Sequence, residues 1–337
     1  MRTLPAVVQL LAVMATTSLS LACGAKDARP ADFSYAGATI RVIVGYRVGG
    51  PYDAHARVLA RFLGNHVPGH PEVIVENMPG ASGAIATKFL TTRTTADGLT
   101  IGQLSATNAP ELIDANLLGA FDLLGGPGPP PQIILFSRRS GITDIDSWRR
   151  VKTPPRFGSN GVSAPPYVVP IVAAAALNLP MQMITGYGSS AEVRLALDAG
   201  EIDAVSVSMD AYETAFQSAD ARVVLRFSAA PIPKIDVPDA LSFVTDDRGR
   251  ELLETGIYQM APMVRFYAVP RGVPAERLAI LRQAVMATFA DPEFVAAAHA
   301  AGLTVDPTSA ATLQAIATKI TSRPDIVGNL RTILKPH

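Results

Sequence analysis

The sequence predicts an α/β protein with mainly parallel sheets that is divided between two domains. In the first half of the chain, short β-branched runs alternate with helical segments, which is typical of a parallel sheet covered by helices. The chain has 337 residues, enough for two domains. The stretch "GGPGPPP" at 125–131 is a strong breaker, and we interpret it as a crossover between these domains.

The expected elements follow one another in a simple order. In the first domain we expect strands at 39–46, 72–77 and 99–105 and helices at 53–64 and 80–90. After the breaker we expect strands at 132–137 and 202–210, strands running into loops at 156–161 and 181–190, and helices at 171–177 and 191–200. A strand at 264–270 then returns to the first domain, and 274–302 forms two helices that are broken at Asp291 and Pro292.

The N-terminal residues have the composition of an export signal. Arg2 precedes an apolar run that ends at Ala22, which is the pattern of a secretory signal peptide over 1–22. The run is shorter than the roughly 20 residues that a membrane span needs, and no later segment qualifies as a span. Cys23 is the only cysteine and follows this run, so we predict a lipoprotein-type signal in which Cys23 is acylated. The alternative is cleavage beside a cysteine without such a role.

The export signal sets the expected location. Residues 23–37 are small and polar and are interpreted as a tether. The mature protein is therefore expected to be periplasmic or otherwise extracytoplasmic, and in contact with the membrane only through the possible lipid anchor.

Charge and ligand patterns exclude several classes of protein. Basic and acidic residues number 29 each, and no basic stripe stands out, which argues against nucleic acid as a partner. His66 and His70 are four residues apart, but Pro68 and Gly69 between them break the helical register that would make them converge. We therefore expect no metal site and no cofactor.

Two catalytic interpretations remain as alternatives. Ser82 and Ser159 lie in glycine-rich loops, but no Gly-x-Ser-x-Gly motif and no adjacent histidine accompany them. The stretch "ITGYGSSA" at 184–191 is a near match to the dinucleotide fingerprint, with Asp210 as a candidate ribose ligand. Because such turns often need glycine for steric reasons alone, we expect a protein without enzymatic activity.

Four glycine-rich junctions share a chemistry that suits an anion. They lie at 49–50, 80–83, 158–161 and 186–189, each between a predicted strand and a helix. Glycine lets the backbone approach a ligand closely, and a helix N-terminus offers unpaired amides and about half a positive charge. Each junction alone could be only a tight turn between a strand and a helix, but several such junctions around one cleft could hold a carboxylate.

Individual side chains near these junctions have distinct expected roles. Arg47 is the strongest candidate for a direct charge contact with the ligand. Asp53 would lie in the first turn of its helix, where we expect it to brace the loop. Tyr46, Tyr52 and Tyr187 could form walls of the cleft.

Several stretches resemble the motifs of a known family. They are "GGPYDAHARVLARFL", "VIVENMPGASGAIA" and "DGLTI", followed by "GSNGVS", "GYGSSAEVRLALDAGEIDAV" and the helical region at 269–302. Together they resemble the substrate-binding receptors of tripartite tricarboxylate transporters, the TctC/Bug-like periplasmic solute-binding proteins. The resemblance covers about residues 38–305.

This resemblance implies a type II periplasmic-binding-protein fold, in which two α/β lobes with mainly parallel sheets are joined by two crossing strands. Lobe 1 would comprise 38–133 plus 262–337, and lobe 2 would comprise 134–261. The implied function is capture of a small carboxylated organic molecule between the lobes and its delivery to the membrane permease of such a transporter. The implied ligand-binding residues are Tyr46, Arg47, Gly49, Gly50, Tyr52, Asp53, Ser105, Ser159, Asn160, Gly161, Ser163, Tyr187, Gly188 and Asp210.

Two departures from the family pattern bear on the ligand. Arg47 stands in a loop that is usually apolar before its glycines, and residues 164–167, "APPY", replace a histidine-leucine pair. The sequence therefore leaves the particular ligand open. A ligand-sensing receptor of a signalling system is an alternative function, and an exported enzyme is a second one.

Overall fold

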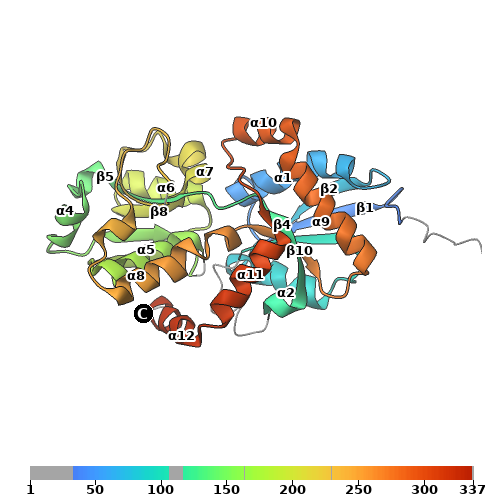
Figure 1. The fold of residues 1–337 in the computed structure, drawn as a ribbon. Helices are drawn as coiled ribbons and strands as arrows, with labels where there is room; N and C mark the ends of the chain where they lie inside the picture. Colours follow the sequence, from blue (N-terminus) through green and yellow to red (C-terminus); the bar gives the residue numbers. More distant parts are fainter. Residues whose placement is uncertain (1–32, 106–116, 163, 229, 336–337) are drawn as a thin grey trace, which may run out of the picture. The chain divides into compact units, whose positions relative to one another are not determined.

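The first sheet takes its strands from both ends of the described chain (Figure 1). The computed structural model describes residues 33–105, 117–162, 164–228 and 230–335, of which those from Ser34 onward form one compact unit. The strand order is β11-β4-β10-β3-β1-β2. The bounds are Thr39–Val44 (β1), Glu72–Asn77 (β2), Thr100–Leu104 (β3), Phe121–Gly126 (β4), Phe266–Pro270 (β10) and Thr308–Ser309 (β11).

The pairing in this sheet is mixed. β1 pairs in parallel with β2 and β3, while β10 inserts between β3 and β4 and is antiparallel to both. Strands β1 to β4 therefore share one direction, and β10 and β11 oppose it. The predicted return of the chain to the first sheet at 264–270 is confirmed by β10.

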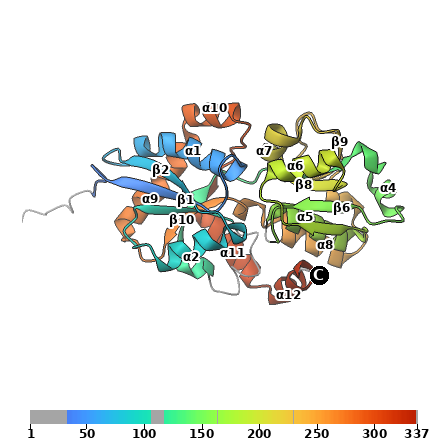
Figure 2. The same cartoon turned by 180° about the vertical axis from the view of Figure 1, so that it is seen from behind.

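Helices cover both faces of the first sheet (Figures 1 and 2). Their bounds are Pro51–Leu63 (α1), Ala84–Thr92 (α2), Ala275–Ala290 (α9), Pro292–Ala300 (α10) and Ala310–Thr321 (α11). α1, α9 and α10 pack on one another, and Phe294 contacts the rings of Phe62 and Phe289 at centroid distances of 6.0 and 5.6 Å. Side chains of α2 and α11 pack in another cluster with Leu104 and Phe266.

The second sheet lies in the middle of the sequence, with strand order β7-β6-β8-β5-β9. Its strands are Gln132–Ser137 (β5), Arg156–Ser159 (β6), Gln182–Thr185 (β7), Ala204–Ser208 (β8) and Ala221–Phe227 (β9). β6 pairs in parallel with β7 and β8, whereas β5 is antiparallel to β8 and β9. In both sheets most strands therefore share one direction, as predicted, although the pairings are mixed.

Alternating side chains of β5 separate the two cores of the second sheet. Ile133 and Leu135 pack towards α6 (Ser190–Ala199) and α7 (Met209–Ala211). Ile134 and Phe136 pack towards α4 (Ile145–Arg149), α5 (Pro165–Leu177) and α8 (Asp247–Leu253). This period of two is the geometry of a strand that is buried on both faces. On the α4 side, the buried Trp148 packs on Phe136 and donates a hydrogen bond to Pro180 O at 2.7 Å.

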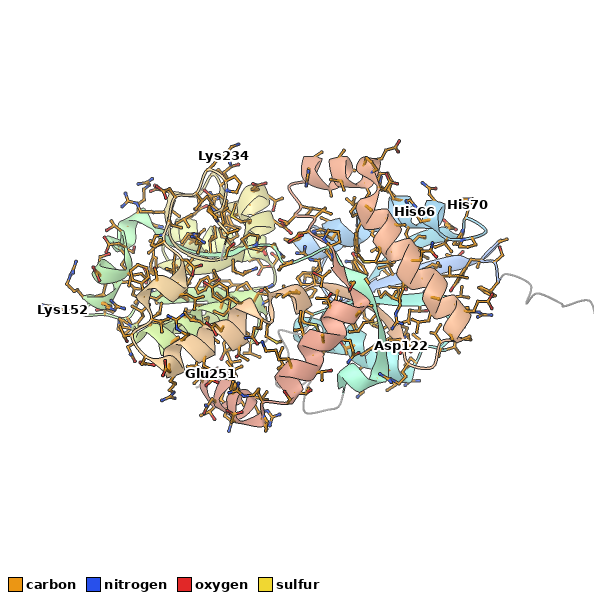
Figure 3. All side chains as sticks on the ribbon, viewed as in Figure 1. His66, His70, Asp122, Lys152, Lys234 and Glu251 are labelled. Atoms are coloured by element: carbon orange, nitrogen blue, oxygen red, sulfur yellow. The ribbon has the colours of Figure 1, made fainter. Side chains whose placement is uncertain are left out.

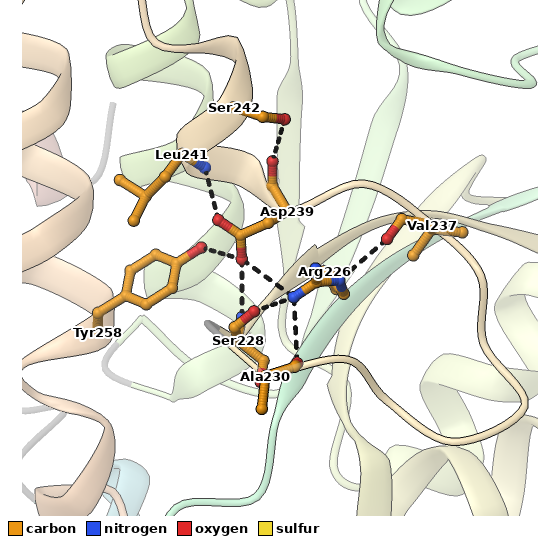
Figure 4. Close-up of polar contacts among 8 residues, drawn as sticks. All are labelled: Arg226, Ser228, Ala230, Val237, Asp239, Leu241, Ser242 and Tyr258. Atoms are coloured by element: carbon orange, nitrogen blue, oxygen red, sulfur yellow. Dashed lines mark hydrogen bonds and ion pairs between the residues drawn. The ribbon is translucent and has the colours of Figure 1, made fainter.

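A polar network attaches the long connection after β9 to the second sheet (Figure 4). The Asp239 carboxylate accepts hydrogen bonds from the Tyr258 hydroxyl at 2.7 Å and from Leu241 N–H at 3.0 Å. Arg226 on β9 lies 3.4 Å from the same carboxylate and donates to Val237 O. The connection is therefore fixed from β9 to the helical turn that contains Tyr258.

The remaining elements are short helical turns. They are Gly64–His66 (η1), Ala81–Gly83 (η2), Leu117–Ala120 (η4), Arg138–Ser140 (η5), Ala240–Phe243 (η7) and Ala261–Met263 (η9), with π-helical turns at Tyr212–Phe216 (η6) and Glu254–Tyr258 (η8). Within the described residues, no helix is both long and apolar enough to cross a membrane.

The chain crosses between the sheets at 127–131 and again at 261–265. The predicted crossover at the proline-rich breaker is thus confirmed. Gly128 has a φ of 96°, and a Cβ at this position would lie 1.8 Å from Asp306 O, so the crossover packs there without room for a side chain.

The C-terminal helix does not follow the predicted lobe boundary. α12 (Pro324–Leu334) places Ile326 and Leu330 in the core of the second sheet beside α5, although 262–337 was assigned to the first lobe. β5 likewise begins at Gln132, two residues before the predicted start of lobe 2. The two-lobe division itself remains a prediction.

At the N-terminus, the signal peptide over 1–22 and the acylation of Cys23 lie outside the described residues. The predicted tether over 23–37 is wrong at its end. Tyr35 is buried, and its N–H donates to Pro68 O at 2.8 Å, because the chain already packs against the first domain there.

Candidate functional site

A cavity of about 600 Å³ lies where loops from the two sheets meet. The first sheet contributes the loop after β1, the start of α1 and residues 79–81 before α2. The second sheet contributes the starts of α5 and α6 and the residues that follow β8. Ligands of α/β proteins commonly bind at such carboxyl ends of parallel strands, which makes this cavity the candidate site.

The structure brings many, though not all, of the predicted site residues to this cavity. Those that line it are Tyr46, Arg47, Gly49, Gly50, Tyr52, Asn160, Tyr187 and Gly188. Those outside its lining are Asp53, Ser105, Ser159, Gly161 and Asp210, and Ser163 lies outside the described residues.

Asp53 braces the first loop from behind. Its buried carboxylate accepts a hydrogen bond from Gly49 N–H at 3.0 Å and one from the Asn77 amide at 2.9 Å, and it pairs with Arg57 at 2.9 Å. Burial acts to raise the pKa of Asp53, but these hydrogen bonds outweigh burial and lower it. The Asn77 amide also donates to Tyr46 O at 3.0 Å, so the loop is held at both ends.

The start of α1 presents free amide donors. Pro51 has no N–H, and Ala54 N–H donates to Gly50 O at 3.0 Å. No side chain caps this helix end. The Tyr52 and Asp53 N–H groups of the first turn therefore lack an acceptor among the described residues, as expected for an uncapped helix start. The positive end of the helix dipole lies at this edge of the cavity.

Arg47 extends from the first loop towards the second sheet. Its Nη1 lies 3.3 Å from the position that a Cβ on Gly188 would occupy, so the missing side chain leaves room for the guanidinium. Among the described residues that line the cavity, Arg47 is the one charged side chain. It is exposed, as a group that awaits an anion would be.

Tyr46 and Tyr52 form a stacked pair on the cavity wall, with ring centroids 4.0 Å apart. The Tyr52 hydroxyl donates to Val264 O at 2.6 Å, which connects the first loop to the second crossover. Ser105 hydrogen-bonds both phenols, and burial raises the pKa of each tyrosine. Ser105 therefore positions the pair from behind.

The loop after β6 differs from its predicted role. The Ser159 hydroxyl is buried and bonds the backbone of Gly161, which suits a turn and leaves no exposed nucleophile. α5 begins at Pro165, and both Tyr167 and Val168 N–H donate to Ala164 O. Since Pro165 and Pro166 carry no N–H, the start of α5 offers no free amide to a ligand. Donors from glycine junctions of both lobes remain a prediction.

The loop before α6 is occupied by its own carboxylate. Glu192 accepts a hydrogen bond from Gly188 N–H at 2.7 Å, and the Ser189 hydroxyl caps the helix by accepting from Glu192 N–H at 3.3 Å. An anion at this helix end would meet the Glu192 charge. The fingerprint-like glycines are thus explained by the turn, which weakens the dinucleotide alternative.

Asp210 belongs to a buried charge cluster and not to the cavity wall. Arg265 Nη1 lies 2.9 Å from Asp210 Oδ2, and the two side chains are 2% and 0% exposed. Thr304 donates to Asp210 Oδ1 through its N–H at 2.9 Å and its hydroxyl at 2.8 Å. The placement of Asp210 among the ligand contacts is therefore corrected, because both carboxylate oxygens have protein partners.

His55 of α1 completes this cluster. Its ring is buried, with Nε2 at 3.4 Å from Asp210 Oδ2. Burial acts to raise the pKa of Asp210, but His55 and Arg265 hold it well below its usual value. The Arg265 guanidinium also lies 4.9 Å from the centroid of the Tyr52 ring, so the cluster supports the cavity wall.

The sequence did not indicate Gln132, which lines the cavity at the first residue of β5. Gln132 is 4% exposed, its Nε2 donates to Pro130 O at 3.2 Å, and its Oε1 has no partner among the described residues. Asn160 Oδ1 is likewise buried without a partner. The sequence could have indicated Gln132, because it is a polar residue at the end of a predicted strand, next to the proline-rich breaker, and strand ends are where a cleft commonly lies.

The histidines do not converge. His66 lies 2.9 Å from Asp291, and Figure 3 shows that His66 and His70 both lie in the region that follows α1. Within the described parts of the chain, no group of three His, Cys, Asp or Glu side chains is arranged to hold a metal ion.

Comparisons with known proteins point to one kind of protein. No protein-family model matches the chain. Over 85 residues it is 40% identical to protein BugT of Bordetella pertussis, and the match covers 25% of this chain and 25% of BugT. The sequence match therefore spans about a quarter of that curated relative.

Solved structures extend the likeness along the chain. The chain is similar to periplasmic binding protein BugD, with a TM-score of 0.69, 20% identity, and coverage of 88% of this chain and 97% of BugD. It is also similar to MatC from Rhodopseudomonas palustris with bound malate, with a TM-score of 0.67, 18% identity, and coverage of 86% and 98%. The fold is that of these periplasmic binding proteins, and the resemblance to the TctC/Bug-like family is confirmed.

Proposed function

We propose that this protein is an extracytoplasmic solute-binding receptor of the TctC/Bug type, which holds a small organic carboxylate in the cavity without chemical conversion. The observation that carries the proposal is the start of α1, where Tyr52 of the uncapped first turn and Arg47 line the same cavity. Amides at a helix N-terminus and an arginine are both suited to a carboxylate. The bound malate of MatC, a protein of the same fold, supports this ligand class.

The proposed ligand contacts are those predicted residues that line the cavity. Arg47 and the first-turn amides would neutralise the carboxylate, and the Tyr46–Tyr52 pair would cover the body of the ligand. Asp53, Ser105 and Ser159 would hold the loops in place. We retain the two-lobe division, export of the chain and delivery of the ligand to a tripartite tricarboxylate-type permease as parts of the same proposal.

Thermal unfolding of the purified mature protein with a panel of organic acids tests ligand binding. A ligand at a hundred times its Kd stabilises a protein by about 2.7 kcal/mol, so at least one acid should raise the Tm clearly. If a broad panel of mono-, di- and tricarboxylates leaves the Tm unchanged, carboxylate binding is excluded.

Arg47→Gln tests the residue that we place nearest the ligand charge. Loss of one charge-assisted hydrogen bond should weaken the binding acid roughly tenfold to a hundredfold. Arg93→Gln is the matched control, because Arg93 is an exposed arginine at the end of α2 outside the cavity lining. Equal affinities for the two variants would contradict the proposed site. A strain that lacks the protein should also lose uptake of that acid, and Arg47→Gln should restore uptake poorly.

A further inference from the structure

We propose that Asp210 joins the two lobes, so that they are either held together at this carboxylate or clearly separated. This rests on the two-lobe division, which is part of the proposed function, and it goes beyond that function because it requires no particular ligand. It follows from where the partners of one buried carboxylate lie along the chain.

The backbone of Asp210 belongs to the second sheet. Asp210 lies in α7, directly after β8, which pairs with β5 and β6. The backbone oxygen of Asp210 accepts a hydrogen bond from the Thr214 hydroxyl at 2.7 Å, so the turn that carries Thr214 is attached to the same place. The backbone at Asp210 should therefore move with lobe 2.

The side chain of Asp210 is bound from outside lobe 2. Oδ1 accepts from Thr304 N–H at 2.9 Å and from the Thr304 hydroxyl at 2.8 Å, and Thr304 lies between α10 and β11. Oδ2 lies 2.9 Å from Arg265 Nη1 in the second crossover and 3.4 Å from His55 Nε2 in α1. All three partners lie outside 134–261. Separation of the lobes would therefore withdraw the carboxylate from its donors.

A second contact joins the same two segments. Gly302 has a φ of 69°, and a Cβ at this position would lie 3.4 Å from Thr214 Cγ2 and 3.7 Å from Glu213 Cβ. The chain after α10 thus packs on η6 of lobe 2, two residues before Thr304 binds Asp210. Thr214 also lines the cavity, so this lobe contact adjoins the proposed ligand site.

Burial should make the contact all-or-none. The Asp210 side chain is 0% exposed and that of Arg265 is 2% exposed. A hydrogen bond weakens steeply once its atoms move apart, so a slight separation would leave a buried charge with too few donors. Only a separation wide enough to admit water would solvate the carboxylate again. Intermediate separations are therefore disfavoured, and two discrete arrangements are expected.

The contact reaches the cavity wall through Arg265. The Arg265 guanidinium lies 4.9 Å from the centroid of the Tyr52 ring, and the Tyr52 hydroxyl donates to Val264 O at 2.6 Å. Tyr52 and His55 are three residues apart on α1, which places them on one face of the helix. Release of Asp210 would therefore move Thr214 away from Tyr52 and open the cavity that both residues line.

A matched pair of substitutions at Thr304 tests this role. Thr304→Val removes the hydroxyl and keeps the shape of the side chain, whereas Thr304→Ser keeps the hydroxyl. Spin labels are attached at Arg93→Cys beside α2 and at Leu195→Cys on α6, two exposed positions of different lobes, in a Cys23→Ser background. Pulsed electron paramagnetic resonance then measures the distance between the labels without added acid.

The proposal predicts a second, longer distance in one variant of the pair. In Thr304→Val the ratio of separated to joined molecules should rise roughly tenfold or more, because one hydrogen bond to a charged acceptor is lost. Thr304→Ser should give the distances of the protein with Thr304. An unchanged distribution in Thr304→Val would overturn the proposal, and so would a gradual broadening without a second population.

A label pair within lobe 2 is the control for a general loosening of the fold. Lys152→Cys and Leu195→Cys are both exposed and both belong to the second sheet and its helices. Their distance should not change in Thr304→Val, and a change would overturn the proposal, because the variant would then have loosened lobe 2 itself. Should Thr304→Val not fold, Asp210→Asn removes the charge, keeps the shape and should give the same longer distance.

The outcome is separate from that of the proposed function, because no acid is present in the measurement. If the distances do not change and an acid raises the Tm, the role of Asp210 is wrong while carboxylate binding stands. If the longer distance appears and no acid of the panel binds, carboxylate binding fails while the role of Asp210 stands.

Discussion

His55→Gln should reduce the loss of folding stability that the protein undergoes when the pH falls below 6.5. The His55 ring is 1% exposed within α1 and lies beside the Asp210–Arg265 pair, with Nε2 at 3.4 Å from Asp210 Oδ2. Burial is the main cause that lowers the pKa of His55 from 6.5 to about 4, and the charge of Arg265 acts in the same direction. The folded protein therefore holds this histidine neutral at a pH where the unfolded chain binds a proton.

The sign and size of the effect follow from this difference. Because the folded pKa is depressed, the contribution of His55 to stability is fully present above pH 6.5 and is lost as the pH falls towards 4. Each pH unit of this interval corresponds to about 1.4 kcal/mol, so the loss is about 3 kcal/mol. Glutamine does not titrate, so this part of the loss should disappear in the variant.

Urea unfolding at several pH values between 4 and 7.5 measures the effect. The free energy of unfolding of the unmodified protein should fall steeply below pH 6.5. That of His55→Gln should fall less, because only the protonation of carboxylates then lowers it. His299→Gln is the control, because His299 lies exposed in the last turn of α10. Parallel profiles for the unmodified protein and His55→Gln would refute the reasoning, whatever the absolute stability of the variant.

Three further predictions concern the surroundings of the cavity. Arg265→Met should lower the free energy of unfolding by about 3–5 kcal/mol, because it leaves the Asp210 carboxylate buried without a cation. In urea unfolding, a double variant that also carries Asp210→Leu should regain much of this stability, and no recovery would mean that the pair is not coupled. In the same assay, Asp53→Ala should lower the free energy of unfolding by about 1–3 kcal/mol, and it should weaken binding of the acid, since the first loop loses the hydrogen bonds of Asp53. Unchanged affinity for the acid would show that the loop does not need these hydrogen bonds. Gly128→Ala should destabilise strongly, because its Cβ would lie 1.8 Å from a backbone oxygen, whereas Gly50→Ala, with open space and a φ of −92°, should stay within about 0.5 kcal/mol.

Much of the fold could be predicted because its elements are bounded by local signals. β2 occupies 72–77 as predicted, and the crossover follows the proline-rich breaker. α5 was predicted too short, since it begins at Pro165 and the helix was placed at 171–177. Proline is favoured at the first position of a helix, and that rule would have recovered the start.

Non-local pairing explains what could not be predicted. β10 inserts between β3 and β4, which are much earlier in the chain, and no local pattern specifies that position. Asp210 was placed at the ligand because it follows a strand, but Arg265, far along the chain, engages its carboxylate. Gln132 was overlooked because its unsatisfied oxygen becomes apparent only when β5 is placed at the cavity.

The two sides of the cavity should contribute differently to recognition. On the first side, Asp53, Asn77 and Ser105 hold the loop and the tyrosine pair before a ligand arrives, so the donors of α1 need little reorganisation. Changes on this side should weaken every acid by a similar factor, because they act on the shared carboxylate. The second side is lined by the starts of α5 and α6 and by the end of β8, and it would contact the rest of the ligand, so changes there should reorder affinities within a series. If Ser190→Ala, at the start of α6, weakens all acids equally, both sides bind the carboxylate and the division of roles is wrong.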